Sequence, residues 1–162
     1  MPMLLPWQPT PQPPDAKSLR PALVLLASEG RAIPNAAIEF AANLAKQGSK
    51  QVKVLSIARI WGSAFGMPHP GLRPNKSEWQ TQRDIVEAAI KALAQRAIDA
   101  RGEVLGSRNA CKSILKHADA IGADAIVMAA DPEPHWTRRG LLWQHLPHIV
   151  ERKAKLPVYL TG

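Results

Sequence analysis

Five short apolar segments alternate along the chain with stretches of helical periodicity, and this alternation constrains the fold more than any other feature. The apolar segments are residues 23–27, 51–58, 103–106, 124–129 and 157–160. The first of them, Leu-Val-Leu-Leu-Ala, has no polar alternation, which is typical of a strand that is buried on both faces. Because parallel strands need long crossover connections, a β-α-β-α order predicts a doubly wound parallel sheet with helices on both faces.

Four segments between the expected strands have the periodicity of helices, and most have recognisable ends. They are residues 34–47, 77–101, 109–121 and 145–153. Pro34 and Pro147 fall in first turns, where the missing N–H costs no hydrogen bond. Asn109 is a typical N-cap residue, and Gly48 and Gly122 are typical of helix ends. The fold class is therefore α/β.

Residues 1–20 are predicted to form a proline-rich extended arm ahead of one domain, residues 21–162. Six of the first fourteen residues are proline. Proline lacks a donor and fixes φ, so this stretch forms neither a helix nor an inner strand. Two interpretations remain: a disordered tail, or an arm that wraps a partner with Leu4, Leu5 and Trp7 as anchors.

The charge balance and the cysteine count narrow the function classes. Lysine and arginine total 21 and the acidic residues 13, a formal net charge of +8, which suits an anionic partner but also simple solubility. The single cysteine, Cys111, rules out an intrachain disulfide and a cysteine-based zinc site. No apolar run approaches the roughly 20 residues of a membrane span, and the first residues do not resemble a signal peptide. We expect a cytoplasmic protein without membrane contact.

The loops that follow the strands are where a parallel sheet places its ligands, at the carboxyl edge where the strand order reverses. Here these loops are residues 28–31, 58–76 and 130–145, and the two long ones are expected to share one edge. The aromatic and basic residues of these loops, together with Trp7 in the arm, are predicted to bind a partner. They are Trp61, Phe65, Arg73, Trp136, Arg138, Arg139 and Trp143. A protein partner is the first hypothesis; nucleic acid, bound by stacking and phosphate neutralisation, is an alternative. A third interpretation is that the tryptophans only fill space or cover the loops.

No residue pattern indicates catalysis or a resident metal. The chain has no P-loop, no G-x-S-x-G and no paired carboxylates. Cys111 has no convincing base near it in the sequence. His135, His145 and His148 are close together but lack supporting carboxylates at matching spacing. We predict that the protein is not an enzyme and holds no metal.

Three stretches resemble the universal stress protein family over about residues 21–161. The first is Glu29-Gly30 followed by the alanine-rich helix segment 37–45. The second runs from Ile114 through Gly122-Ala123-Asp124 to the Ile-Val-Met strand, and the third ends in Leu-Pro-Val-Tyr-Leu, residues 156–160. The resemblance implies a five-stranded sheet of order 3-2-1-4-5, of the adenine nucleotide alpha-hydrolase-like type, usually in a dimer.

The sequence departs from the glycine motif G-x-x-G-x(9)-G-[ST] of the ATP-binding members. In that motif glycines let backbone N–H groups approach phosphates. The two leading glycine positions here fall on Ala129 and Pro132, and the final pair falls on Gln144 and His145. Glu29 stands where the family has its adenine-side Asp, Gly30 is retained, and Arg31 replaces Ser. We therefore predict that the protein holds no cofactor and does not bind ATP tightly.

Three hypotheses for function follow from these residues. The first is a non-enzymatic regulatory module of this family that acts through protein partners. The second is a protein that binds ATP or AMP in an altered pocket. Its candidate residues are Glu29, Gly30, Ile57 and Ala129, with Arg138, Arg139 and His145 in place of the glycine cradle. The third is a basic protein associated with nucleic acid.

The last apolar segment is the predicted dimer contact. In the order 3-2-1-4-5 its residues Val158, Tyr159 and Leu160 lie at a sheet edge, where unpaired N–H and C=O groups invite a further strand. A two-fold axis would pair this strand with its own copy in an antiparallel sense. We therefore expect a homodimer.

Overall fold

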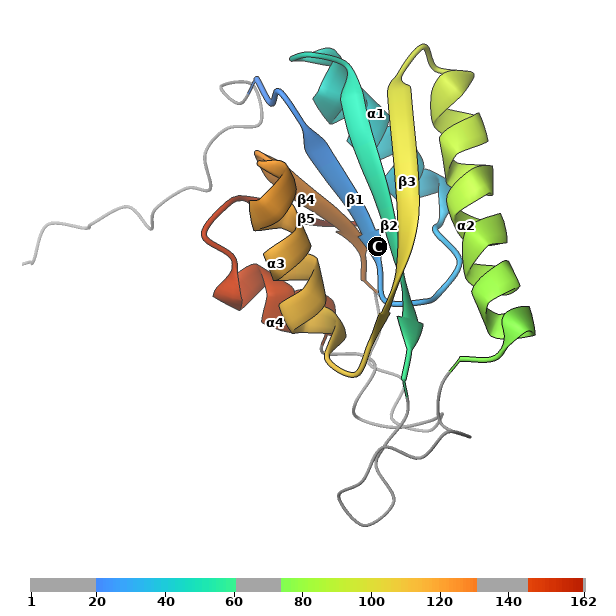
Figure 1. Cartoon of the computed structure of the whole chain (residues 1–162). Helices are drawn as coiled ribbons and strands as arrows, with labels where there is room; N and C mark the ends of the chain where they lie inside the picture. Colours follow the sequence, from blue (N-terminus) through green and yellow to red (C-terminus); the bar gives the residue numbers. More distant parts are fainter. Residues whose placement is uncertain (1–19, 61–73, 131–145, 162) are drawn as a thin grey trace, which may run out of the picture.

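The computed structural model describes residues 20–60, 74–130 and 146–161, and in these ranges five strands alternate with four helices (Figure 1). The elements are β1 (Val24–Ser28), α1 (Asn35–Lys46), β2 (Gln51–Arg59), α2 (Lys76–Ala94), β3 (Asp99–Ser107), α3 (Ala110–Ile121), β4 (Ala125–Ala129), α4 (Leu146–Lys153) and β5 (Val158–Thr161). All strand pairs are parallel and the order is β3-β2-β1-β4-β5, as predicted. Of the predicted arm, only Arg20 is among the described residues.

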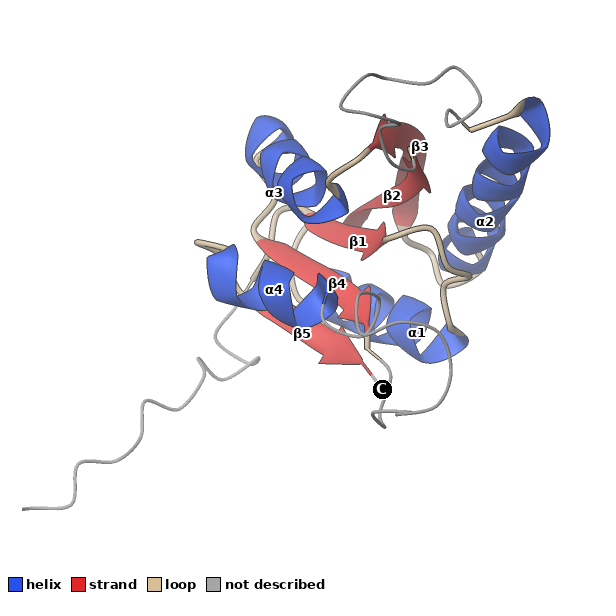
Figure 2. Cartoon of the chain, turned by 90° about the horizontal axis from the view of Figure 1, so that it is seen from below, coloured by secondary structure: helices blue, strands red, loops and turns tan. Residues whose placement is uncertain are grey.

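The sheet separates two helix layers. Figure 2, which looks at the carboxyl ends of the strands, shows α1 and α2 on one face of the sheet and α3 and α4 on the other. Each face has its own cluster of buried apolar residues. None of the helices within the described ranges is long and apolar enough to cross a membrane.

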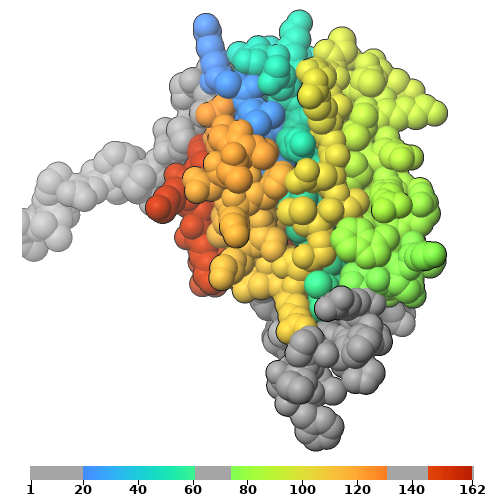
Figure 3. All heavy atoms as spheres, viewed as in Figure 1, coloured from blue at the N-terminus to red at the C-terminus, as the bar shows by residue number. Residues whose placement is uncertain are grey.

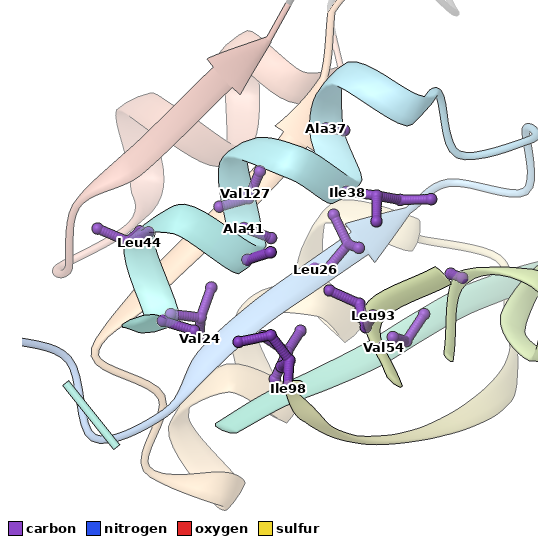
Figure 4. Packing of buried hydrophobic residues seen from close by; sticks show 14 of the residues in the cluster. Val24, Leu26, Ala37, Ile38, Ala41, Leu44, Val54, Leu93, Ile98 and Val127 are labelled. Atoms are coloured by element: carbon purple, nitrogen blue, oxygen red, sulfur yellow. The ribbon is translucent and has the colours of Figure 1, made fainter. Parts of the chain in front are cut away.

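Strand β1 is the centre of both clusters, since all five of its residues are buried. Val24 and Leu26 point to the layer of α1 and α2, where Leu26 lies close to Ile38 of α1 (Figure 4). Leu25 and Ala27 point to the opposite layer. Burying each leucine contributes about 2 kcal/mol. The unbroken apolar pattern of this segment follows from its two covered faces.

The turn between α3 and β4 ties the start of β4 to the start of β1. Gly122 adopts φ +67°, a left-handed conformation that favours glycine and ends α3. The Asp124 carboxylate then accepts hydrogen bonds from the backbone N–H groups of Ala22 (2.8 Å) and Leu23 (3.0 Å). In return, the backbone N–H of Asp124 donates to the carbonyl of Leu23 at 2.9 Å. The Gly-Ala-Asp stretch therefore sets the register of two central strands.

The predicted helix over 77–101 was too long, and the strand after it was too short. Helix α2 ends at Ala94, the chain turns at Ala97 with φ +59°, and β3 begins at Asp99. Strand β3 pairs with β2 over its whole length, from Asp99 opposite Gln51 to Ser107 opposite Arg59. The ladder of this pairing outweighs the helical periodicity of the segment, a long-range effect that no local pattern carries.

Gly48 lies at the end of α1, as predicted, directly after the C-cap residue Gln47. The residue with positive φ after α1 is Lys50 (φ 59°), not Gly48. A Cβ on Gly48 would lie 1.9 Å from the carbonyl oxygen of Pro21, so glycine is needed here for close backbone contact. Ser49 donates to the same carbonyl at 3.2 Å. This contact joins the chain leaving α1 to the segment entering β1.

Replacing Asp124 with alanine is expected to lower the free energy of unfolding by about 1–3 kcal/mol, because two backbone N–H groups lose a charged acceptor. Urea denaturation measures the change. Asp119→Ala removes an exposed carboxylate one turn earlier and serves as the matched control, with an expected change within about 0.5 kcal/mol. Equal effects of the two substitutions would contradict the role given to Asp124.

Candidate functional site

A tight turn after β1 forms the centre of the carboxyl edge. The Ser28 hydroxyl donates to the carbonyl of Arg31 at 2.5 Å and accepts from the N–H of Gly30 at 3.2 Å. Gly30 has φ +112°, and a Cβ there would lie 2.8 Å from the carbonyl oxygen of Ile57. Both facts require glycine at this position. The turn therefore lies directly against the end of β2.

The carboxylate of Glu29 is buried in this turn and paired. Its side chain is 3% exposed, and the Nε of Arg31 donates to Oε1 at 2.6 Å. A buried carboxylate is costly unless it is paired and hydrogen-bonded. The Arg31 guanidinium provides that compensation.

A second guanidinium approaches the same residue from β2. The Nε of Arg59 donates to the backbone carbonyl of Glu29 at 3.3 Å. Burial lowers the pKa of Arg59 below its ordinary value; the Glu29 carboxylate opposes this shift, and the nearby charge of Arg31 adds to it. One carboxylate therefore lies among two guanidinium groups.

A buried chain of hydrogen bonds connects the turn to α2. The Ser56 hydroxyl, which is fully buried, donates to Oε1 of Gln82 at 2.5 Å. The Nε2 of Gln82 donates to the carbonyl of Gly30 at 3.1 Å. Strand β2, helix α2 and the turn after β1 are therefore held to one another by one amide side chain.

Two small pockets flank the turn, at the point where the strand order reverses. One, of about 210 Å³, is lined by residues that include Ala27, Glu29, Pro34, Ala129 and Thr161. The other, of about 200 Å³, is lined by Gly30, Ile57, Arg59, Pro74 and Gln82 among others. Each is smaller than the roughly 300 Å³ at which pockets for small ligands usually begin. Glu29 and Arg31 line both pockets and separate them.

The structure brings together four of the residues predicted to surround a nucleotide. Glu29, Gly30 and Ile57 line one pocket, and Ala129 lines the other together with Glu29. The other nucleotide candidates, Arg138, Arg139 and His145, lie outside the described residues, as do the predicted partner-binding residues. The latter are Trp7, Trp61, Phe65, Arg73, Trp136, Arg138, Arg139 and Trp143. Residues 61–73 and 131–145 of the two long loops are likewise outside, although the strands before them, β2 and β4, end at the same edge.

Sequence reasoning missed two residues of this site and the partner of a third. Arg59 directly follows the expected strand 51–58, so its position at the carboxyl edge could have been predicted from the sequence. The pairing of Arg31 with Glu29 could not be predicted from the sequence, because the side chains of two residues in a turn can point in many directions. Gln82 gave no signal, since a glutamine on a helix is usually exposed.

The other chemical candidates have ordinary environments. Cys111 is 5% exposed, and burial raises the pKa of its thiol, against an opposing effect of Lys153. His148 lies beside Glu151 on the exposed face of α4. Within residues 20–60, 74–130 and 146–161, no group of three or more His, Cys, Asp or Glu side chains is placed to hold a metal ion.

Comparison with known proteins gives one family. The model of the universal stress protein family matches residues 22–161. No curated protein matches the sequence.

Solved structures of the same fold include proteins from Archaeoglobus fulgidus and Burkholderia pseudomallei. A universal stress protein from Archaeoglobus fulgidus has a TM-score of 0.64 at 17% identity, over 86% of this chain and 93% of the other. A family member from Burkholderia pseudomallei has a TM-score of 0.62 at 16% identity, over 92% and 98%. The Archaeoglobus fulgidus universal stress protein in complex with dAMP has a TM-score of 0.61 at 16% identity, over 89% and 98%. At sequence identities this low, the similarity to these structures shows a shared fold and nothing further.

The hydrogen-bond chain through Gln82 leads to a double-mutant prediction. Gln82→Ala leaves the buried Ser56 hydroxyl without its acceptor and is expected to cost about 1–3 kcal/mol of stability. In the Gln82→Ala background, Ser56→Ala is expected to restore part of the loss, because the orphaned hydroxyl is removed. Urea denaturation of the four proteins of the cycle measures the coupling. Strictly additive losses would show that the two side chains act independently.

Proposed function

The chain belongs to the universal stress protein family, and we propose that it is a non-enzymatic member that acts by binding a partner and does not bind ATP tightly. The observation that carries this proposal is the ion pair between the buried carboxylate of Glu29 and the partly exposed guanidinium of Arg31. Glu29 stands where the ATP-binding members have the carboxylate on the adenine side. In this chain that carboxylate is already paired with Arg31 inside the protein.

Breaking this pair for a ligand would be costly. The Glu29 side chain is 3% exposed, so it needs a charged partner inside the fold, and a base that binds Glu29 must compete with Arg31 for it. The two pockets are small, and the side chains of the pair lie between them. On the phosphate side, Pro132 has no N–H to offer and Ala129 stands in place of a glycine. Both halves of the nucleotide site therefore argue against tight binding.

A second candidate function is binding of AMP or ATP in an altered mode. The fold neighbour from Archaeoglobus fulgidus was solved in complex with dAMP. In this chain Gly30 and Ile57 line a pocket at the carboxyl edge. Mass spectrometry of the native protein separates the two candidates, because a retained AMP or ATP would favour the second.

Calorimetry is expected to show ATP binding weaker than about micromolar, because the base-side carboxylate is paired with Arg31. A dissociation constant of about micromolar or tighter would contradict the proposal. Arg31→Ser, which restores the residue of the ATP-binding members, is expected to raise the affinity for AMP by releasing Glu29. Arg83→Ser, at an exposed position of α2, is the matched control and is expected to leave it unchanged.

We also propose that β5 forms a homodimer contact. The strand has one neighbour, β4, in the described sheet. The carbonyls of Pro157 and Thr161 accept hydrogen bonds from β4, at 3.0 Å from Ile126 and 2.7 Å from Ala130. Successive residues of a strand alternate in direction, so the backbone groups of Val158 and Leu160 face the free edge.

This alternation decides which proline substitution tests the dimer. Val158→Pro removes an N–H that faces the free edge, and light scattering is expected to fall from about twice the 17.7 kDa chain mass to the monomer. Val158→Ala keeps the N–H and is the control, expected to stay dimeric. Tyr159→Pro is less informative, because it removes a donor that faces β4 and disturbs the fold itself. A monomeric parent protein, or a dimeric Val158→Pro variant, would rule out this contact.

A further inference from the structure

A groove of about 530 Å³ lies on the molecule between α3 and the connection from α4 to β5. Figure 3 shows the surface of α3 (orange) next to that of the C-terminal elements (red). Residues of α3 one turn apart form one wall, and residues 153–156 form the other. The groove shares no lining residue with the two pockets around Glu29.

Four lysines converge on this groove. Lys112 and Lys116 come from α3, and Lys153 and Lys155 come from the opposite wall; all four are exposed. Asp119 is the single acidic residue among the described lining residues. We call these four lysines and the groove between them the lysine groove.

These charges are not balanced within the described part of the molecule. The ion pairs found there involve Arg31, Lys53, Arg96, His117 and His148, and none of the four lysines of the groove. Lys112 and Lys116 are four residues apart on one helix face, so they repel each other. An anionic ligand would relieve a repulsion that the folded chain otherwise retains.

The floor of the groove is apolar. Leu115, Ala154 and Leu156 are half-buried, and Cys111 is buried. Leu115 and Leu156 also pack against the core cluster of α3 and α4, which fixes their positions. The groove therefore combines apolar side chains at its base with positive charges on both walls.

We propose that the lysine groove binds an acidic segment of a protein partner, with an apolar side chain seated between flanking carboxylates. The proposal rests on the proposed function, since it identifies the class of partner for a module that acts by binding. Charge complementarity selects the occupant: the positive charges stand on two walls, and Lys112 and Lys116 are about 6 Å apart along the helix axis. Such a spread matches several separate carboxylates better than one compact anion.

The backbone at the groove also disfavours a compact phosphate. Phosphate sites usually use free N–H groups at a helix start or arginine forks. The N–H of Lys112, in the first turn of α3, already donates to the Asn109 side chain at 3.0 Å. The described lining includes no arginine.

The test uses the full chain and a fluorescein-labelled peptide, Glu-Glu-Leu-Glu-Glu-Leu-Glu-Glu, in a fluorescence anisotropy titration. The double variant Lys112→Gln/Lys153→Gln removes one charge from each wall. It is expected to weaken binding about tenfold, because each neutralised rim charge contributes a few-fold. The matched control is Lys46→Gln/Lys91→Gln, which removes the same charge from exposed positions of α1 and α2. It is expected to change binding less than about twofold, since these positions lie on the other face of the sheet.

Peptide variants test the two parts of the proposed ligand. Replacing Glu by Gln in the peptide is expected to abolish binding, and replacing Leu by Ser to weaken it. No binding of the parent peptide, or equal losses in the two protein variants, would overturn the proposal. Displacement of the peptide by tripolyphosphate or by single-stranded RNA at concentrations below those of unlabelled peptide would overturn it as well, in favour of those anions.

The proposal and the proposed function can fail separately. Tight ATP binding together with selective peptide binding would contradict the proposed function and support the groove. Weak ATP binding together with no peptide binding would contradict the groove alone. Melting curves of the lysine variants establish that they are folded, and the exposed positions of the four side chains predict unchanged midpoints.

Discussion

The burial of β1 between two neighbouring strands and two helix layers is the constraint on which the rest of the structure depends. A strand with no exposed face must be apolar throughout, and it needs α1 and α2 on one side and α3 and α4 on the other. Its backbone must be paired on both edges, which β2 and β4 provide. Asp124 fixes where this strand begins. The same arrangement makes β1 the point at which the strand order reverses, so the turn after it lies in the crevice of the sheet.

The chemistry of that turn follows from burial as well. A carboxylate that is 3% exposed cannot remain without compensation, and the chain supplies Arg31 within the turn. Arg59 from β2 donates to the backbone carbonyl of the same residue and interacts electrostatically with its carboxylate. Gly30 allows the close approach to Ile57, and Gln82 ties α2 to the same place. A turn of this kind is already complete without a ligand. This is the physical basis for proposing that the protein has kept the fold of its family, while Arg31 now pairs with the carboxylate that would otherwise bind a nucleotide.

The positive side chains behind the net charge of +8 have different surroundings in different parts of the described molecule. At the carboxyl edge, positive groups lie against the buried Glu29 and stabilise it. At the lysine groove, four positive groups meet one acidic residue, Asp119, and an apolar floor. The amino-acid composition does not distinguish these two groups, but the four lysines of the groove are exposed and take part in none of the ion pairs found among the described residues. A regulatory module of this kind would offer its contact surface on the layer of α3 and α4, away from the pockets that flank the turn after β1.

The sequence by itself determined the alternation of strands and helices, because apolar runs indicate the strands and local signals such as Asn109 and Gly122 indicate where helices begin and end. It determined the parallel sheet as well, since the connections are too long for hairpins, and the family resemblance carried the strand order. The predicted helix over 77–101 ran too far at its C-terminal end, because the pairing of β3 with β2 is a long-range interaction. The close contact of Gly48 with Pro21 was not predicted, because the two residues are distant in sequence. Of the candidate site, the sequence indicated Glu29, Gly30, Ile57 and Ala129 through their places after strands and the family resemblance. The Glu29–Arg31 pair, the link through Gln82 and the lysine groove were decided by the tertiary structure alone, because side-chain direction and the contacts between distant elements exist only once the sheet has formed.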